Sequence, residues 1–435
     1  MPNSNCEEML AARVKTQTHS TCYATWFTWI ICLTGALFYC YEYLLRVMPS
    51  IMELELREAF KLDSVAFGNL MGFYYYAYTP MQFPVGILMD SYGPRRLLIL
   101  ACLICALGSY LFTMQSHLLL SQIGRLFVGF GSAFAFIGFL KLATLWLPAR
   151  RFSFVTGLIM TLCMLGVTQG NLLIDILMEN QGWKNTIFVF ATFGILLSFA
   201  MALIIPKENG HNPEHFPVQS LKHLIQELFN LAKNPYLWAN GMIGCFLFLS
   251  LSAFGEAWGI SYFQEGRGFS KELAVHTNNY LFWGWAVGSP FIGWFSDIIK
   301  HRRSLLIFGA LGTALTFWAL LFLPYNTPVW TFKTLLFLVG IFSSSQILVF
   351  PIARELSSSA LAATSLAFTN FLVMIGGVIL QPGVGYLLQL KWDGQMINNV
   401  PVYSLHAYQF SLSALTIAAL LAAFIGLFTR ETYQK

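Results

Sequence analysis

The sequence is poor in charge. Only 10% of its 435 residues are Asp, Glu, Lys or Arg, whereas 57% are hydrophobic and the mean hydropathy is +0.62. A typical soluble domain carries about 25% charged residues, so this composition excludes soluble enzymes, disordered regulators and nucleic-acid-binding proteins. Because a membrane-crossing helix needs about 20 apolar residues, the chain has room for twelve crossings but not for a second soluble domain. We therefore expect an integral membrane protein.

Common catalytic and nucleotide-binding motifs are missing as well. The chain has no H-E-x-x-H, no G-x-S-x-G and no Walker loop, which argues against an enzyme and against ATP-driven transport. His211, His215 and His223 share one central polar segment, where solvent exposure is favoured over a metal site. We expect neither a cofactor nor a bound metal.

Eight cysteines are present, but their placement does not predict disulfides. Cys6 and Cys22 precede the first apolar segment and the other six lie inside apolar segments. Cys102 and Cys105 form a C-x-x-C in an uninterrupted apolar run, where packing is favoured over redox or metal chemistry. Residues 1–25 are polar and mixed in charge, unlike a cleaved signal peptide, and we expect them to be a cytoplasmic tail.

Twelve apolar segments predict twelve transmembrane helices. With the amino terminus inside, fifteen Lys and Arg residues fall in cytoplasmic segments, seven fall outside and three lie within spans. This bias favours both termini on the cytoplasmic side of the membrane. The predicted spans are residues 26–48, 67–89, 97–114, 118–144, 154–176, 185–205, 236–262, 277–298, 304–324, 331–352, 362–388 and 405–428.

The longest polar break runs from Pro206 to Pro235 and divides the chain into six spans and six. Leucine and isoleucine recur at helical spacing between Leu221 and Leu231, which predicts an amphipathic helix on the cytoplasmic surface. We therefore expect a tail (1–25), an N-terminal six-helix bundle (26–205), a linker (206–235) and a C-terminal six-helix bundle (236–435).

A repeated motif supports this division. The second span ends PVGILMDSYGPRR (84–96) and the eighth ends FIGWFSDIIKHRR (291–303). Four identities at one offset indicate duplicated halves, an arrangement found in many secondary transporters. The expected fold is therefore an all-α polytopic membrane protein with twelve transmembrane helices in two pseudo-symmetric six-helix bundles. The offset is 207 residues, so that Gly86, Asp90, Arg95 and Arg96 correspond to Gly293, Asp297, Arg302 and Arg303.

The motif also carries a family resemblance. The pattern Gly86-x-x-x-Asp90-x-x-Gly93-x-Arg95-Arg96 resembles the signature loop of the major facilitator superfamily, and Arg125-x-x-x-Gly129-x-Gly131 resembles its second motif. The resemblance covers the whole chain and implies a transporter that works by alternating access. Ser91 departs from the pattern, because many members have a basic residue there.

A second departure concerns the fifth span. Drug-proton antiporters of the superfamily carry a glycine-rich fifth helix, and here Gly157, Gly166 and Gly170 keep its spacing while Asn171, Ile174 and Asp175 replace its Pro-Gly-Gly end. This replacement weakens an efflux-antiporter interpretation. The segments YEYLLRVMPS, FYYYAYTPMQFPVGILMD and GSAFAFIGFLKLATLWLP resemble a branch of the superfamily that is common in intracellular gamma-proteobacteria and includes phagosomal amino-acid and nucleoside transporters. This resemblance implies that the protein lies in a bacterial inner membrane.

Ionisable residues inside spans are the first site candidates, because a charge in the bilayer is costly unless it faces protein or a water-filled cavity. Glu42 and Arg46 lie four residues apart on the first span, and Arg125 lies at similar depth on the fourth, so Glu42 and Arg125 could pair. Alternatively, Glu42 and Arg46 form an i,i+4 pair and Arg46 reaches the outer headgroups. Glu256 is the main acidic group of the second half, either in the cavity or at its mouth.

The remaining candidates are uncharged apart from Lys141, which lies near the cytoplasmic end of the fourth span and either lines the lower cavity or reaches the headgroups. Four tyrosines at 74, 75, 76 and 78 surround the second helix, so we expect only one or two to face a cavity. Five further side chains are candidates for binding a solute or a neighbouring helix: Tyr39, Tyr43, Asn279, Gln346 and Asn370.

An amino-acid zwitterion fits this set of side chains. Arg125 or Arg46 would bind its carboxylate, and Glu42 or Glu256 its ammonium. Proton coupling needs a buried carboxyl that takes up a proton outside and releases it inside, for which Glu42 is the first choice and Glu256 the second. We expect proton-coupled import of an amino acid or related nutrient by a monomer among membrane lipids. The alternatives are export of a metabolite, drug or siderophore, and solute sensing by a non-transporting receptor of the same fold.

The signature loop predicts a cytoplasmic gate. Asp90 ends a helix, where the helix dipole disfavours a carboxylate, so Arg95, Arg96 and Arg150 should neutralise it. The family resemblance implies that Asp90 faces the start of the eleventh helix and latches the cytoplasmic side. The weaker symmetry-related latch would consist of Asp297, Arg302 and Arg303. The two loops also contain Gly86, Gly93 and Gly293. The alternative is a basic loop that only contacts headgroups.

Overall fold

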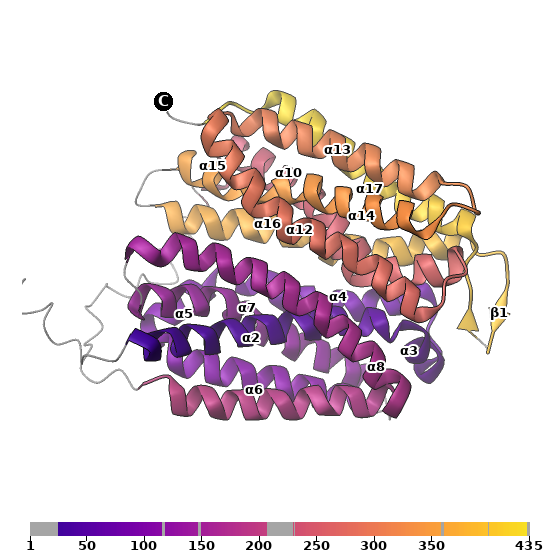
Figure 1. Ribbon diagram of the computed structural model, residues 1–435, viewed down its shortest axis with the longest axis horizontal. Coiled ribbons are helices and arrows are strands. Elements are labelled where there is room, and N and C mark those ends of the chain that lie inside the picture. Colours follow the sequence, from indigo (N-terminus) through magenta and orange to yellow (C-terminus); the bar gives the residue numbers. More distant parts are fainter. Residues whose placement is uncertain are drawn as a thin grey trace, which may run out of the picture.

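The computed structural model describes residues 25–114, 118–146, 149–206, 229, 231–357, 361–398 and 400–432, which are mostly helical. Long helices run side by side along the longest axis of the molecule (Figure 1). Residues 1–24 of the expected tail and most of the linker expected at 206–235 lie outside the described residues. In the first half the elements are α2 (Thr25–Ile51), α3 (Glu53–Phe60), α4 (Ser64–Met81), α5 (Pro84–Tyr92), α6 (Pro94–Thr113), α7 (Leu118–Trp146) and α8 (Ala149–Ile204).

The second half begins at residue 235 and ends in the long helix α17. It contains a short antiparallel pair of strands, in which Ile397 pairs with Val400. Its elements are α10 (Pro235–Leu249), η1 (Ser250–Trp258), α11 (Gly259–Ser261), η2 (Tyr262–Gly266), α12 (Lys271–Ile299), α13 (Arg302–Phe322), α14 (Val329–Ser343), η3 (Ser344–Leu348), α15 (Val349–Glu355), α16 (Ala362–Leu390), β1 (Met396–Ile397), β2 (Val400–Pro401) and α17 (Leu405–Phe428).

These elements make twelve crossings. Within the described residues, nine helical segments are long and apolar enough to cross a membrane, and one of them, Thr161–Ile204, holds two crossings because Gly182 breaks α8 with a φ of 76°. A further crossing consists of α4 and α5, which are separated near Pro80 and Pro84 because proline lacks the N–H that an uninterrupted helix needs. The last is the 29-residue helix α12.

The two halves occupy separate layers (Figure 1), with α2 to α8 on one side and α10 to α17 on the other. They meet where α4 packs on α16 and where α8 packs on α12. Glycine permits this close approach: a Cβ on Gly68 would lie 2.7 Å from the carbonyl oxygen of Gln381, and one on Gly385 would lie 2.2 Å from that of Ser64. We call these layers the N half and the C half.

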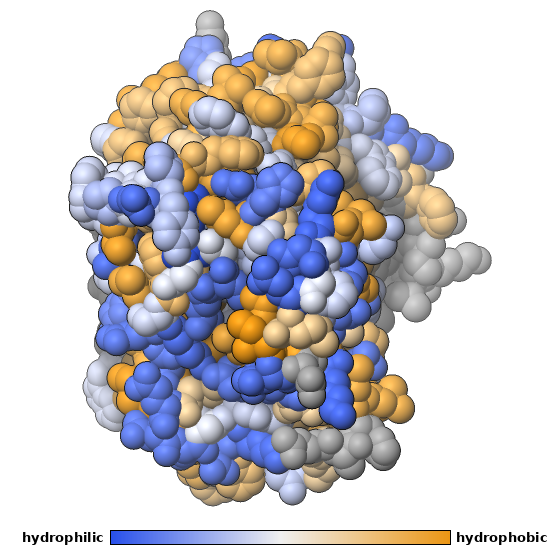
Figure 2. Space-filling view, turned by 90° about the vertical axis from the view of Figure 1, so that its right-hand side faces the viewer, coloured by the Kyte–Doolittle hydropathy of each residue, from blue (hydrophilic) through white to orange (hydrophobic). Residues whose placement is uncertain are grey.

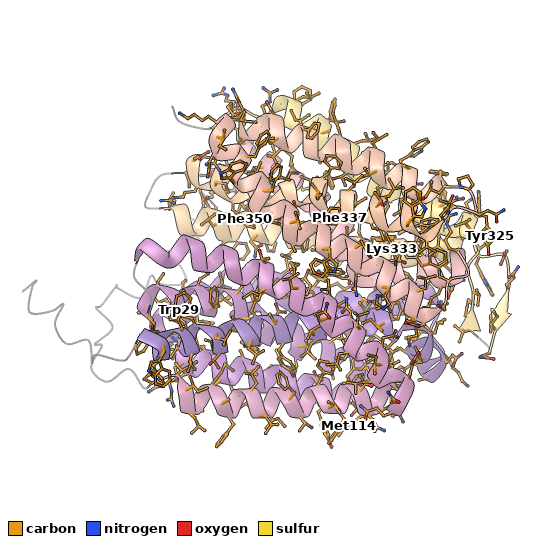
Figure 3. The ribbon with its side chains drawn as sticks, viewed as in Figure 1. Trp29, Met114, Tyr325, Lys333, Phe337 and Phe350 are labelled. Carbon is orange, nitrogen blue, oxygen red and sulfur yellow. The ribbon has the colours of Figure 1, made fainter. Side chains whose placement is uncertain are left out.

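The two ends of the bundle differ in structure. The terminal end is where α2 begins and α17 ends, whereas the hairpin end carries α3 and the β1–β2 hairpin (Figure 1). Hydrophilic residues gather on the hairpin-end face and hydrophobic residues dominate its upper rim (Figure 2). Aromatic side chains lie toward both ends, Trp29 at one and Tyr325 at the other (Figure 3), as expected for membrane interfaces.

Two crossings of the C half are irregular at mid-length. The seventh passes from α-helix into the π-helical segment η1, and the tenth contains the 3-10 segment η3. Such departures from α-helical geometry change the direction in which side chains project and often mark functional sites. Glu256 lies in η1 and Gln346 lies in η3.

Candidate functional site

Arg46 is the centre of a buried charge cluster. Its Nη2 lies 3.3 Å and 3.4 Å from the two carboxylate oxygens of Glu42, one turn earlier on α2. Its Nη1 lies 3.8 Å from Oε1 of Glu256, which comes from the C half. Arg46 is 3% exposed and both glutamates are 0% exposed. One guanidinium therefore bridges two carboxylates across the contact between the halves.

Tyrosine hydroxyls complete the bonding of both carboxylates. Tyr74 accepts a hydrogen bond from Nε of Arg46 (2.9 Å) and donates one to Glu42 (3.1 Å). Tyr43 and Tyr75 donate to the two oxygens of Glu256 at 2.7 Å and 2.5 Å. Because Tyr43 and Tyr75 belong to the N half, Glu256 is bound by three groups from the opposite half.

Aromatic rings also surround the guanidinium. Its central carbon lies 4.5 Å from the ring centroid of Tyr43 and 5.0 Å from those of Tyr74 and Tyr78. At these distances a desolvated cation is attracted to the ring faces, so the rings stabilise a charge that the apolar surroundings would otherwise disfavour. We call the following group the central cluster: Glu42, Tyr43, Arg46, Tyr74, Tyr75, Tyr78 and Glu256.

Arg125 has a different environment from the one expected. Its Nη1 donates to the carbonyl of Leu45 (3.0 Å) and its Nη2 to that of Arg46 (3.4 Å). In an α-helix the Leu45 carbonyl would accept from residue 49, but Pro49 has no N–H, and Arg125 supplies the missing donor. The expected Glu42–Arg125 pair is therefore wrong, because the arginine binds the backbone of α2 beside the cluster.

The structure decides two alternatives that the sequence left open and corrects one expectation. Arg46 does form the i,i+4 pair with Glu42, but it is buried and does not reach the headgroups. Glu256 is fully buried and so does not lie at a mouth. Three of the four tyrosines, not one or two, face the cluster, because positions 74, 75 and 78 lie within about 100° of the helix circumference; only Tyr76, 37% exposed, points away.

Most of the remaining candidates lie outside the central cluster. Tyr39 packs its ring 5.4 Å from that of Phe136, and Lys141 lies sixteen residues beyond Arg125 on α7, about 24 Å along the helix axis. Gln346 is buried in η3. The two asparagines bond across the halves: Asn370 donates to Gln82 (2.7 Å), and Asn279 accepts from Asn171 (2.8 Å).

A second buried charge cluster lies at the hairpin end and was not foreseen from the sequence. Nη1 of Arg57 lies 3.2 Å from Glu53 and 2.9 Å from Glu265, while its Nη2 donates to the carbonyl of Pro401. Ser261 donates to Glu53. Burial raises the pKa of Glu53 to about 8, against the opposing effect of Arg57. The sequence feature that could have indicated this cluster is the spacing E-x-x-x-R, which Glu53 and Arg57 share with Glu42 and Arg46 on the first span.

Tyrosines belong to this second cluster too. The hydroxyl of Tyr408 and the main-chain N–H of Tyr403 both donate to Oε2 of Glu265, at 3.1 Å each. The guanidinium of Arg57 lies 5.3 Å from the ring centroid of Tyr403. We call Glu53, Arg57, Ser261, Glu265, Tyr403 and Tyr408 the hairpin-end cluster.

Ion pairs between the halves are unevenly distributed. Three are present among the described side chains: Arg46–Glu256 in the middle, and Arg57–Glu265 and Lys271–Glu55 (2.5 Å) at the hairpin end. The described ion pairs nearer the terminal end stay within the C half, such as the pair between Arg302 and Glu355 at 2.9 Å. Charge therefore holds the halves together at the centre and at the hairpin end.

The signature-loop arginines bind backbone at the terminal end. Arg95 donates to the carbonyls of Ala202 and Ile205 at the end of α8, both at 2.6 Å. Arg303 does the same at the end of α17, with Gly426 at 3.0 Å and Leu427 at 2.6 Å. Arg95 and Arg303 thus make equivalent contacts in the two halves. The repeat in the sequence instead matches Arg95 with Arg302, one position before Arg303.

The other loop residues have varied surroundings. Arg96 is exposed, and Asp297 is exposed with Arg302 3.9 Å away. Gly93 has a φ of 76°, a conformation that favours glycine, whereas a Cβ at Gly86 or Gly293 would meet open space. The side chains of Asp90 and Arg150 lie outside the described residues, so their expected latch stays a prediction.

A twelve-crossing bundle whose two halves share a buried cluster of charged side chains has the architecture of a secondary membrane transporter. Comparison with known families agrees: the model of the Major Facilitator Superfamily matches residues 30–381. The chain belongs to this superfamily. It is a multi-pass membrane transporter of a small molecule and not an enzyme.

Several curated transporters are similar to parts of the chain. A probable sulfoacetate transporter of Cupriavidus necator is 25% identical over 300 residues, which cover 65% of this chain and 69% of that protein. Probable anion transporter 7 of Oryza sativa is 27% identical over 36% of each chain. A probable galactarate/D-glucarate transporter of Escherichia coli is 22% identical over 41% of this chain and 40% of its own length.

Solved structures confirm the expected fold. A bacterial homologue of the human lysosomal transporter Spinster, in an inward-facing and occupied conformation, superposes with a TM-score of 0.73 over 93% of this chain and 97% of that one. The sequence identity is 14%, so this likeness concerns the fold alone.

Proposed function

We propose that the protein imports a small solute bearing a carboxylate or sulfonate, together with protons, by alternating access. The observation that carries this proposal is Arg46 held between Glu42 and Glu256 where the two halves meet. A guanidinium is well suited to bind a carboxylate or a similar anion. The solute would take the place of one of the glutamates that Arg46 now contacts.

Charge balance accounts for the protons. Two arginines, Arg46 and Arg125, and two glutamates, Glu42 and Glu256, give this buried region no net charge when all are ionised. An added anion leaves one uncompensated negative charge, which is costly in a medium of low dielectric constant. A proton on Glu256 restores neutrality, and it also releases the 3.8 Å contact with Arg46. We therefore assign the coupling proton to Glu256 first and to Glu42 second, which reverses the order that the sequence suggested.

The printed names of the relatives support an anionic substrate, since they mention sulfoacetate, galactarate/D-glucarate and anions. An amino acid also carries a carboxylate and stays within the proposal, with its ammonium on Glu42. The resemblance to phagosomal nutrient transporters favours the amino acid. The two classes differ in net charge, so they predict different numbers of coupled protons.

The sidedness of the two gates follows from the predicted topology. The distribution of Lys and Arg favours the terminal end on the cytoplasmic side of the inner membrane, which places the hairpin end outside. The ion pairs at that end then close the outer side. When they open, we propose that the loops 86–96 and 293–303 with Arg150 hold the cytoplasmic side of the monomer closed.

The proposal is tested in two steps. A thermal-shift screen of purified protein with sulfonates, hydroxy dicarboxylates and amino acids identifies ligands, and uptake of each ligand into proteoliposomes is then measured with and without an inward proton gradient. We expect Glu256→Gln to retain counterflow but to lose at least tenfold of the stimulation by the gradient, whereas the exposed Glu179→Gln retains both.

Two results contradict the proposal. A full gradient response in Glu256→Gln removes this carboxyl from the coupling step. Binding of a ligand without counterflow in the wild-type protein indicates a receptor instead of a transporter.

A further inference from the structure

A row of polar side chains runs along the face of α8 that meets α12. Thr168, Asn171 and Asp175 lie three and four residues apart, so they share one side of the helix. Asn171 is fully buried and Asp175 is 4% exposed. Counting from the break at Gly182, Asp175 lies about 10 Å inside the crossing. A carboxyl at this depth needs a partner or a function.

The amides form a chain with one direction. Asn279 donates to the carbonyl of Thr168 (3.2 Å), and Asn171 donates to Oδ1 of Asn279 (2.8 Å). The Thr168 carbonyl can only accept, so neither amide can be turned over without placing two oxygens against each other. The oxygen of Asn171 is therefore fixed as an acceptor that faces away from Asn279.

Two buried oxygens in this row have no hydrogen-bond partner among the described residues: Oδ1 of Asn171 and Oδ1 of Asp175. They belong to residues one helical turn apart on the same face. Buried polar atoms are nearly always paired, and each exception calls for an explanation. Both orphaned atoms are acceptors, so the partner that they lack is a hydrogen-bond donor or a cation.

Protein cations do not fill this role in the part of the chain that the structure describes. The charged groups that act on Asp175 are Lys271 and Glu272 at the start of α12, Glu179 on α8 and Glu55 on α3. Lys271, the one cation among them, is already paired with Glu55 at 2.5 Å. The acidic groups outnumber it, which favours uptake of a further positive charge.

A hollow lies beside the same row. It measures about 510 Å³ and opens between α8, α12 and α14, with Thr168, Gln169, His276, Asn279, Tyr280 and Phe337 in its lining. Phe337 lies where α14 runs next to α12 (Figure 3). Thr168 and Asn279 belong to both the hollow and the amide chain, so the polar row can be approached from the hollow.

We propose that Asp175 and Asn171 form a second cation site, separate from the central cluster, that binds a proton or a sodium ion through oxygen atoms. A proton on Asp175 would be donated to the orphaned oxygen of Asn171, whereas a sodium ion would be bound by both oxygens. The site lies on the α8–α12 contact between the halves, so its occupancy stabilises the arrangement described here. Its contribution to coupling rests on the proposed transport function, but the binding itself does not.

The test measures binding without any substrate. The melting temperature of purified protein is recorded in sodium chloride and in choline chloride of equal ionic strength, across a pH series. We expect sodium or a lower pH to raise the melting temperature of the wild type, and roughly 2–4 °C of that rise to depend on Asp175 and to be lost in Asp175→Asn. Glu58→Gln, which changes an exposed carboxyl on α3, should behave like the wild type.

The two ligands give different results. A rise with sodium at fixed pH identifies a sodium site, and a rise with falling pH that is independent of sodium identifies a proton site. Asp175→Asn should fold, because its amide can donate to Asn171 and so imitates the occupied state. If this variant retains the full wild-type response, or if radioactive sodium binding and proton release on acid–base titration are both unchanged in it, the site is refuted whatever the outcome for Glu256.

Discussion

The central cluster and the hairpin-end cluster are built to the same pattern. Each has an E-x-x-x-R pair from the N half and a glutamate from the C half, which lies on the seventh crossing of the chain. Tyrosine hydroxyls complete both clusters. They differ in how tightly the arginine holds the glutamate of the opposite half. The distance is 3.8 Å between Arg46 and Glu256 but 2.9 Å between Arg57 and Glu265.

The surroundings extend this difference. Tyr43 and Tyr75 donate to Glu256 from the N half, so that glutamate would keep two partners if Arg46 bound a solute. Arg57 is bound additionally by the carbonyl of Pro401, which ties it to the hairpin. The loose pair is suited to exchange one anion for another, whereas the tight pair is suited to hold an end closed. One arrangement of residues is thus suited to the proposed substrate binding in one place and to the proposed closure in the other.

Replacing the two arginines should have the largest effect and should separate the clusters. Arg46→Gln leaves two buried glutamates without their cation. Losing one partner of a buried ion pair costs about 3–5 kcal/mol. We therefore expect uptake to fall more than 100-fold and ligand-induced thermal shifts to disappear. Arg57→Gln should keep those shifts but open the hairpin end. Proteoliposome uptake and labelling of a cysteine placed at exposed Glu58 measure both effects.

The comparison fails if both variants lose ligand binding equally, or if Arg46→Gln transports normally. Arg46→Lys provides the matched control for charge. A lysine is a point charge without the planar fork of the guanidinium, so we expect it to restore stability more than uptake.

The pH dependence of stability should be the next largest effect, and Glu53 at the hairpin end should contribute a distinct part of it. Burial raises the pKa of Glu53 from 4.5 to about 8, so between these values the native state binds a proton that the unfolded chain releases. The resulting stabilisation is complete below about pH 4.5 and is lost as the pH rises through about 8. We expect Glu53→Gln to remove roughly 2–4 °C of the fall in melting temperature between pH 5 and pH 9. An unchanged slope in Glu53→Gln, with Glu58→Gln as the exposed control on α3, would place the titrating group elsewhere.

Scarcity of charge explains why the sequence identified the central cluster. In a chain with 10% charged residues, Glu42, Arg46 and Glu256 stood out inside apolar spans, and the repeat indicated the twelve-helix fold. The hairpin-end cluster escaped because Glu53 and Arg57 precede the second span, where charges are ordinarily solvated. Their burial depends on β2 and α17, which are more than 300 residues away in the chain.

The partners within the central cluster were also beyond the sequence. Arg125 binds a carbonyl that Pro49 leaves free, and this requires knowing that α7 packs against α2. Glu256 lies in a π-helical segment, whereas helical periodicity assumes 3.6 residues per turn. Sequence reasoning therefore located the charges but could not assign which atoms they contact.

The smallest effect concerns two adjacent tyrosines and is the finest test of the assignment. Tyr75 donates to Glu256 at 2.5 Å, whereas Tyr76 points away from the cluster and is 37% exposed. A hydrogen bond to a charged group contributes about 1.5–3 kcal/mol, so Tyr75→Phe should lower uptake by about tenfold or more. Counterflow should fall no further than uptake does, because the Glu256 carboxylate still accepts a hydrogen bond from Tyr43. Tyr76→Phe should stay within twofold of the wild type. Equal losses in the two variants would mean that the second helix presents a different face to the substrate than the one described here, since only the orientation of α4 distinguishes these neighbouring residues.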